Sequence, residues 1–445
     1  MADSALRLAG YYGDHMLFQR NAPIPLSGWA APGARVVAGD GQTTVQVTAD
    51  AAGRWSLQLP ARSAVPSMTL TLESSGHRLV LRDVAVGELW FAAGQSNMAW
   101  PMAWIKGRSD DVASARDAGL RLLSVAPAAW HAPRTDASGL WHATTPQTVR
   151  EFSALAYHFG RELRGALDVP VGLIHAGWGG SRIEPWLPPT AYARLMPAQA
   201  HLAENLHNRG HAPAALYNAM VHPFTVLPVR GVIWYQGEAN LADGPHYGPK
   251  LEALIEGWRE AWASPSLPFL FAQIAPLDYT PYAPNPPPDL LQRFWETQID
   301  VLRVPGTGLV STLDLNPDRE LHPGEKREAG ERFAALALQQ VYGIGAEAQS
   351  PRYRRHRVDG AQVRVEWLHA QGLRSPDGGP LQGFELAGAD GVFHPAQARI
   401  DGDAVMLTSE RVPQPQRVRY AWQATPAVGL VNGAGLPALP FRAPR

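Results

Sequence analysis

The pentapeptide Gly-Gln-Ser-Asn-Met at positions 94–98 is the stretch of this chain most suited to chemistry. It follows the hydrophobic run 84–93, which predicts a buried strand that delivers Ser96 at its carboxyl end. A serine hydroxyl is a weak nucleophile by itself, so catalysis by Ser96 requires a histidine base and hydrogen-bond donors for an oxyanion. Gln, Ser and Asn are also common turn formers, so the pentapeptide alone favours a plain loop.

His322 stands out as a base among the 15 histidines. Pro323 disfavours a helical backbone at His322, which is therefore expected in an extended loop before the helix-like pattern over 325–341. Three acidic residues lie just upstream: Asp314, Asp318 and Glu320. Any of them could orient the imidazole, although a solvated acidic loop with a capping histidine would have the same composition.

Oxyanion donors are expected in two further polar segments that follow apolar runs. Gly179 and Gly180 can present backbone N–H groups in conformations closed to other residues, and the side-chain amide of Gln236 is another donor. Glu238 could orient Gln236 or pair with Arg182. Glycines after a strand also make ordinary turns, so this segment is weak evidence without the others.

Apolar strand-like runs alternate with amphipathic helical patterns between about 84 and 345. This alternation predicts a parallel sheet with helices on both faces, and ligands bind such sheets outside the carboxyl ends of the strands. Polar segments follow four of the runs, at 94–97, 177–182, 236–240 and 314–322. The candidate nucleophile, donors and base are therefore expected along one edge of the sheet.

Short alternating runs with turn signals flank this region on both sides. Residues 5–83 predict a small antiparallel β-sandwich. Residues 346–445 predict further β-strands, either as a separate module or packed beside the N-terminal sandwich. We therefore predict an α/β fold in three parts: 5–83, 84–345 and 346–445.

Charge and composition exclude several kinds of partner. With 39 basic and 40 acidic residues the net charge is −1, so no whole-chain field attracts nucleic acid or an anionic membrane. No apolar run reaches the roughly 18 residues of a transmembrane helix, so we expect no membrane insertion. The first four residues do not resemble a signal peptide, and we expect a periplasmic or secreted protein whose signal peptide is not part of this sequence; a cytoplasmic location stays open.

We expect neither a metal nor a cofactor. The absence of cysteine excludes disulfides and thiolate metal sites. His207 and His211 have the spacing of a zinc motif, but Asn208 stands where His-Glu-x-x-His has its glutamate. A solvated loop explains these histidines better.

Four blocks, in order, resemble the sialate O-acetylesterase branch of the SGNH hydrolases. They are Gly-Gln-Ser-Asn-Met at 94–98, Gly-Trp-Gly-Gly at 177–180, Trp-Tyr-Gln-Gly-Glu-Ala-Asn at 234–240 and Leu-His-Pro at 321–323. Similar stretches at 13–20, 84–90, 383–388 and 435–437 extend the resemblance over nearly the whole chain. The resemblance implies a flavodoxin-like three-layer α/β/α catalytic domain and a metal-free serine esterase that removes O-acetyl groups from sugars.

The same resemblance implies roles for single residues. Ser96 would be the nucleophile and His322 the base. The N–H of Ser96, a glycine of the pair Gly179 and Gly180, and Gln236 would form the oxyanion hole.

The acid that supports His322 is where this chain departs from the superfamily. SGNH enzymes commonly have an aspartate three residues before the histidine, and here that position is Arg319. Many members of the branch instead have Asp-Ile-His-Pro, which aligns Glu320 as the acid, with Asp318 as the alternate. A Ser-His dyad completed by a backbone carbonyl is a further alternative.

The substrate is expected to be an acetylated carbohydrate. Candidate contacts are Gln95, Asn97, Trp178, Arg182 and Glu238. Sialic acid, xylan, xyloglucan and other polysaccharides all fit. Arg182 could meet a sialate carboxylate, or it could pair with Glu184 or Glu238.

Two other functions remain as alternatives. A noncatalytic sugar-binding protein would use its tryptophans as stacking platforms. Those near the predicted site are Trp100, Trp104, Trp178, Trp186 and Trp234. A retaining glycosidase would need two carboxylates about 5 Å apart, for instance Glu238 with Asp314 or Glu320, but this leaves Ser96 and the glycines unexplained.

Overall fold

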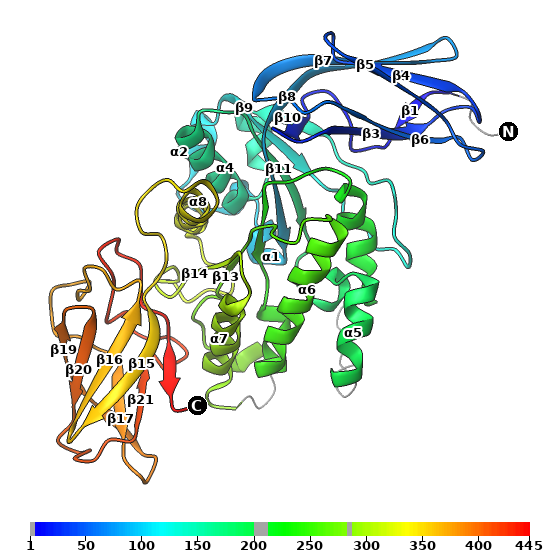
Figure 1. Ribbon diagram of the computed structural model, residues 1–445. Helices are drawn as coiled ribbons and strands as arrows, with labels where there is room; N and C mark the ends of the chain where they lie inside the picture. The colour runs from blue at the N-terminus through cyan, green and yellow to red at the C-terminus, as the bar shows by residue number, and fades with distance from the viewer. Residues whose placement is uncertain (1–4, 200–211, 283–286) are drawn as a thin grey trace. The chain divides into compact units, whose positions relative to one another are not determined.

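The computed structural model describes residues 5–199, 212–282 and 287–445, and the fold divides into two compact units. The first contains Met1–Gln236 and Glu252–Phe269, and the second contains Gly237–Leu251 and Leu270–Arg445. Along the chain, β-strands come first, an α/β region follows, and β-strands return toward the C-terminus (Figure 1). His207 and His211 lie outside the described residues.

Two sheets are built from the strands that precede the α/β region. The alternating pattern of the sequence is the cause: in β6, Trp55, Leu57 and Leu59 are buried and the residues between them are exposed. One sheet has the order β1-β3-β6 (Arg7–Leu8, Ile24–Trp29, Arg54–Leu59). The other contains β4 (Arg35–Gly39), β5 (Thr44–Thr48), β7 (Val65–Ser74) and β8 (His77–Gly94).

Strand β8 is continuous over 18 residues and serves two sheets. Its first part pairs antiparallel with β7, and β2 (Leu17–Gln19) pairs with it at residues 85–87. Its last part pairs in parallel with β11 (Val171–Gly177) and β12 (Gly231–Tyr235). The boundary predicted between residues 83 and 84 therefore falls inside a strand.

The parallel strands of the first unit have the order β9-β11-β8-β12, with β9 at Asp117–Ser124, and β10 (Trp141–Thr144) joins β9 antiparallel. Neighbouring residues of a strand point to opposite faces, and helices meet both faces of β8. Trp90 packs on Phe159 of α4 with ring centroids 5.0 Å apart, and Phe91 packs on Trp258 of α6 at 5.7 Å. The layered arrangement predicted from the sequence is present in this unit.

The helices of the first unit begin and end as local chemistry dictates. At α4, Ser153 Oγ accepts the N–H of Ala156, and Asp168 ends the helix with a left-handed backbone. In the described residues these helices are α1 (Ser96–Ala99), η1 (Met102–Trp104), α2 (Ser109–Ser114), α3 (Pro146–Arg150), α4 (Ala154–Leu167), η2 (Glu184–Trp186), α5 (Pro189–Gln199), η5 (Tyr217–Val221) and η6 (His222–Phe224). Helix α6 (Tyr247–Ala261) contributes residues to both units.

The second unit starts with a smaller α/β part. Strand β13 (Phe269–Ala272) neighbours β14 (Thr307–Val310), and α8 (Lys326–Tyr342) packs on β14. The other elements are η7 (Glu238–His246), η8 (Thr280–Tyr282), α7 (Leu290–Asp300) and η9 (Val301–Arg303). Helix α8 ends at Gly343, which adopts the left-handed conformation.

Two four-stranded sheets form the C-terminal region, which has its own core. Their orders are β15-β16-β20-β19 (Arg352–Asp359, Gln362–Leu368, Ala404–Thr408, Gln397–Asp401) and β18-β17-β21-β22 (Phe393–Pro395, Phe384–Ala387, Arg417–Tyr420, Phe441–Ala443). Val365, Leu386, Val405 and Val418 are fully buried in this core. The β-rich C-terminal region expected from the alternating runs is therefore present.

Candidate active site

Three neighbouring strand ends bring the predicted nucleophile and donors together in the first unit. Gly94, the last residue of β8, lies opposite Gly177 of β11 and Tyr235 of β12. The N–H of Gln95 donates to Tyr235 O at 3.0 Å, and the N–H of Trp178 donates to Gly94 O at 3.0 Å. The segments that follow β8, β11 and β12 therefore leave the sheet side by side.

Gly94 is required at the point where β8 turns into α1. Its φ of +149° is unfavourable for other residues, and a Cβ atom there would lie 2.1 Å from Tyr235 O. Ser96 is then the first residue of α1 and is partly exposed, whereas Gln95, Asn97 and Met98 are buried. The strand thus presents the serine at the surface of an otherwise buried turn.

Helix α1 is held in place by the start of α4. Ser153 Oγ donates to Met98 O at 2.6 Å while it accepts the N–H of Ala156. Backbone bonds from Ala154 N to Trp100 O and from Met102 N to Phe152 O, both 3.0 Å, continue this attachment. The backbone around Ser96 is therefore fixed before any substrate binds.

The predicted glycine pair lies beside Ser96. A Cβ atom at Gly179 would be 3.8 Å from Ser96 Cβ, and Gly180 has a φ of +68°. At Gly177 a Cβ atom would lie 2.7 Å from Ala99 Cβ, so this loop can pass so close to α1 only with glycine there. The backbone of this loop therefore passes close to Ser96, the predicted nucleophile.

Gln236 connects the three segments from a fully buried position. Its Nε2 donates to Gln95 Oε1 and to Ser181 O, both at 3.1 Å. The opposite orientation of this amide would place its oxygen against the Ser181 carbonyl oxygen, so the assignment is chemically sound. Both N–H groups of Gln236 are thus engaged, and it can stabilise an oxyanion only by giving up one of these bonds.

Arg182 pairs with Glu184, one of the partners considered for it. The distances are 3.3 Å from Nε to Oε2 and 3.1 Å between NH2 and Oε1, and both side chains are buried. The neighbouring Ser181 accepts the indole N–H of Trp186 at 2.9 Å. The chain after Gly180 is therefore held by a buried ion pair that the sequence left as one of three possibilities.

The tryptophans considered as stacking platforms fall into two groups. Trp186 and Trp234 are fully buried and pack edge-to-face with centroids 5.9 Å apart, so they are core residues that cannot meet a sugar. Trp104 is 63% exposed and packs edge-on against Trp100 at 5.0 Å. An exposed indole therefore follows closely after α1.

In the second unit, His322 lies in an irregular loop before α8, as its proline predicts. The side chain of Asn316 fixes this loop: Oδ1 accepts the N–H of Glu320 at 2.9 Å, and Nδ2 donates to Glu320 O at 3.0 Å. Nδ2 also donates to Pro276 O at 2.8 Å. The loop that leads to His322 is therefore held by hydrogen bonds between the Asn316 side chain and backbone groups.

The acidic residues before His322 do not support it by hydrogen bonds. Glu320 and Asp318 are exposed, and within the part of the chain that the structure describes neither carboxylate makes a hydrogen bond or ion pair. Asp314 pairs with Arg332, with 2.6 Å between Oδ1 and NH1. The predicted acid Glu320 and its alternate therefore point to solvent in this conformation.

Lys326 is a charged neighbour of His322. Burial lowers the pKa of His322, and the positive charge of Lys326 lowers it further. Lys326 is 2% exposed and donates from Nζ to Pro323 O at 2.7 Å. The sequence analysis did not single out Lys326, although its position on the apolar face of α8, with Ala329 and Phe333, is a signal that could have done so.

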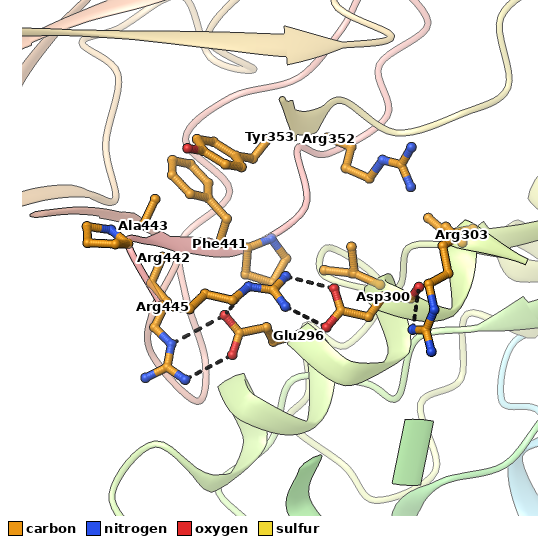
Figure 2. A pocket seen from close by; sticks show the side chains of 13 residues that line it. Glu296, Asp300, Arg303, Arg352, Tyr353, Phe441, Arg442, Ala443 and Arg445 are labelled. Atoms are coloured by element: carbon orange, nitrogen blue, oxygen red, sulfur yellow. Dashed lines mark hydrogen bonds and ion pairs between the residues drawn. The ribbon is translucent and has the colours of Figure 1, made fainter. Parts of the chain in front are cut away.

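A cavity of about 530 Å³ in the second unit contains none of the predicted site residues (Figure 2). It lies between the α7–η9 segment and strands β15 and β22. Arg442 pairs with Glu296 at 3.0 Å and Arg445 with Asp300 at 2.8 Å. Since these carboxylates are neutralised by arginines, the cavity is an ion-paired seam and not a second acid–base site.

Neither a metal site nor a membrane span is evident in the described residues. No group of three or more histidine or acidic side chains there could hold a metal ion. Over the same residues, no helix is both long and apolar enough to cross a bilayer.

Comparisons with known proteins identify a family and relatives of this chain. The sequence model of a family described as carbohydrate esterase, sialic acid-specific acetylesterase matches residues 86–339. The sialate O-acetylesterase of Homo sapiens is 28% identical over 380 residues, which cover 77% of this chain and 72% of that protein. That of Rattus norvegicus is 26% identical over 406 residues, covering 77% and 74%.

A solved structure is similar over nearly the whole length. The crystal structure of a carbohydrate acetylesterase from Xanthomonas citri superimposes with a TM-score of 0.91 at 36% identity, covering 98% of this chain and 99% of that one. The predicted fold class, an SGNH-type α/β domain with flanking β-rich regions, is confirmed. The residues matched by the family include both Ser96 and His322.

Proposed function

This chain belongs to the sialic acid-specific acetylesterase family of carbohydrate esterases, and from that premise we propose that it removes O-acetyl groups from a glycan through an acetyl-enzyme on Ser96. It is a carboxylic ester hydrolase. The observation that carries the proposal is the partly exposed Ser96 at the start of α1, with the Gly179 backbone beside it. A fixed serine next to glycine backbone is the arrangement that acyl transfer needs.

The mechanism follows from these groups. His322 takes the proton from Ser96 Oγ as the oxygen attacks the acetyl carbonyl carbon, and the N–H groups of Ser96 and of Gly179 or Gly180 stabilise the oxyanion. The intermediate collapses as His322 returns the proton to the departing sugar oxygen. Water then attacks the acetyl-enzyme with His322 again as base, and acetate and Ser96 are released.

Gln236 has a positioning part in this mechanism. Its two amide bonds, to Gln95 Oε1 and Ser181 O, hold the nucleophile segment and the glycine loop at a fixed separation. Its predicted role as a third oxyanion donor requires one of those bonds to open. The oxygen of a bound substrate would then have to take the place of Gln95 Oε1 or Ser181 O as acceptor.

We favour a Ser96–His322 pair supported by backbone over a carboxylate triad. The exposed carboxylate of Glu320, or that of Asp318, would have to swing toward His322 to support it. His322 is then a weakly assisted base, and its own low pKa keeps it neutral.

A neutral acetylated sugar fits the first unit best. Because Arg182 is paired with Glu184, it offers no unpaired charge to a sialate carboxylate. Gln95, Asn97, Trp178 and Glu238 remain the proposed substrate contacts, with xylan and xyloglucan as candidate carriers of the acetyl group. Such a substrate agrees with the periplasmic or secreted location that we propose.

The alternatives have less support. In a retaining glycosidase the carboxylate pair would include Asp314, which is tied to Arg332, or the exposed Glu320. Against a noncatalytic sugar-binding protein, two of the five tryptophans considered as stacking platforms are buried in the core and cannot contact a sugar.

The test is Ser96→Ala, assayed with p-nitrophenyl acetate and by acetate release from acetylated glycans. We expect kcat to fall by about 10³-fold or more, because the nucleophile is gone. Ser138→Ala is the matched control, since Ser138 is an exposed serine of the same unit, and it should keep full activity. Wild-type turnover by Ser96→Ala would refute the mechanism.

A further inference from the structure

Lys326 is a buried lysine at the first position of α8, four residues after His322. Its Nζ donates to Pro323 O at 2.7 Å, and its own N–H donates to Gly324 O at 2.8 Å. The carbonyl that the ammonium holds belongs to the residue directly after His322. Lys326 therefore fastens the start of the helix to the turn that carries the candidate base.

The periodicity of α8 explains why this lysine is buried. Ala329, Gly330 and Phe333 follow at the spacing of one helix face, and all three are buried. Loss of hydration on that face lowers the pKa of Lys326 to about 7, against the opposing effect of the carboxylates of Glu238 and Glu325. Burial therefore makes the charged form of Lys326 costly, and the two carboxylates favour it.

The charge reaches His322. Burial lowers the pKa of the imidazole first, and the nearby ammonium of Lys326 adds to that effect. Below about pH 7 the lysine is mostly protonated, so its charge is present over the range in which His322 takes up a proton. Acidic groups also lie near this pair. The carboxylates of Glu238, in η7, and Glu325 raise the pKa of Lys326. Those of Glu328 and Asp318 raise the pKa of Glu325.

We propose that Lys326 is a positioning residue for His322: its ammonium fixes the His322–Pro323 turn and opposes a second positive charge on the imidazole. The proposal rests on His322 being the base of the proposed function. A neutral imidazole can accept the proton of Ser96, and the imidazolium that forms is a stronger acid toward the departing sugar oxygen. Lys326 therefore extends the activity toward acidic pH.

The sign of the pH effect follows from the lowered pKa. The base must be neutral, so kcat/KM falls as the pH drops through the pKa of His322 in the free enzyme. In the wild type this acidic limb lies below the ordinary histidine value of 6.5. Removal of the lysine charge raises the pKa of His322, so the limb moves to higher pH.

Two variants separate the charge from the hydrogen bond. Lys326→Met removes both, and Lys326→Gln removes the charge but keeps an N–H donor for Pro323 O. We expect both to move the acidic limb of kcat/KM to higher pH. We expect kcat at the optimum to fall roughly 10- to 100-fold in Lys326→Met and less in Lys326→Gln, because only the first loosens the turn.

The titration of His322 itself gives a readout that does not depend on turnover. It can be followed by NMR with ¹⁵N-histidine labelling and assigned by the signal that His322→Gln removes. We expect the pKa of His322 to be higher in both lysine variants than in the wild type. This measurement tests the proposal even if Ser96 is not the nucleophile, whereas failure of the proposed mechanism would show as normal turnover in Ser96→Ala.

Arg327→Gln is the matched control. Arg327 is the next cation on α8, is partly exposed and pairs with Glu331 at 2.8 Å. It should change neither the titration of His322 nor the acidic limb. If the pKa of His322 is the same in Lys326→Met, Lys326→Gln and the wild type, the proposal is wrong, and Lys326 is only a structural residue.

Discussion

At the scale of single residues, His322 is notable for the charges around it. A typical catalytic histidine has a carboxylate that stabilises its protonated form. Here the side-chain carboxylates of Glu320 and Asp318 are exposed and make no hydrogen bond in the described structure, and a buried lysine opposes protonation. These surroundings favour the neutral form of the imidazole. Such a histidine is a weaker base, but it stays neutral and can accept a proton at lower pH.

Substitution of the two acids tests whether either supports catalysis. We expect Glu320→Gln and Asp318→Asn each to keep kcat within about threefold of the wild type on p-nitrophenyl acetate, because exposed carboxylates stabilise little. Glu410→Gln, at another exposed position, serves as the control. A loss of about 100-fold in one variant alone would identify that residue as the catalytic acid and would contradict the dyad.

The residue types that carry the chemistry were predictable because they stand at the ends of apolar runs. Ser96, Gly179 and Gln236 follow three strands, and the sheet brings them together as the pattern predicts. The partners of those residues were not predictable. Whether Arg182 pairs with Glu184, or whether Lys326 turns inward, depends on packing that a linear spacing does not encode.

At the scale of elements, a buried ion cluster ties β8 to its neighbours where its pairing with β11 begins. Glu88 is fully buried, pairs with Arg20 after β2, and pairs with Arg230 before β12 at 2.7 Å. Gln19 of β2 donates to the same carboxylate at 3.3 Å. One side chain thus joins three strands that are distant in sequence.

Replacement of Glu88 should destabilise the protein without altering its chemistry. In Glu88→Ala the two arginines lose their common partner, and we expect the free energy of unfolding to fall by roughly 3 kcal/mol. Urea denaturation measures this, and kcat of the folded fraction should be unchanged. Glu73→Gln breaks the exposed Glu73–Arg78 pair and should cost less than about 1 kcal/mol, so an equal loss in both variants would argue against the cluster.

Element boundaries were less predictable than element types. The split at 83/84 rested on a change of texture, yet β8 passes through it, with a local irregularity at Asp83, whose backbone is left-handed at φ +54°. The tryptophans show the same limit. Trp186 and Trp234 were placed near the site by their position in the sequence, and their side chains point into the core.

At the scale of the whole molecule, the charges nearly cancel. The net charge of −1 comes from 39 cations and 40 acidic groups, and many of them are paired locally, as at Arg419–Glu385 and Arg442–Glu296. Long-range steering of a charged polymer needs an excess of one sign. We therefore expect the substrate to be an uncharged glycan.

The salt dependence of kcat/KM tests whether the substrate is uncharged. We expect kcat/KM on a neutral acetylated polysaccharide to change by less than about twofold when the salt concentration is raised to roughly 1 M, because screening has little field to remove. An acetylated acidic glycan is the comparison substrate. A steep loss of kcat/KM with salt, together with a preference for the acidic glycan, would contradict a neutral substrate.

The continuity of β8 also has a consequence for synthesis on the ribosome. The N-terminal strands can fold as soon as β8 has emerged, since β8 pairs with β7 and β2, which are made before it. The last part of the same strand is then already in place, and β11 and β12 pair with its two edges as they are translated. The β-rich start of the chain would thus act as the template on which the esterase sheet assembles, and a shortened protein that begins at residue 84 would have to form that sheet without it.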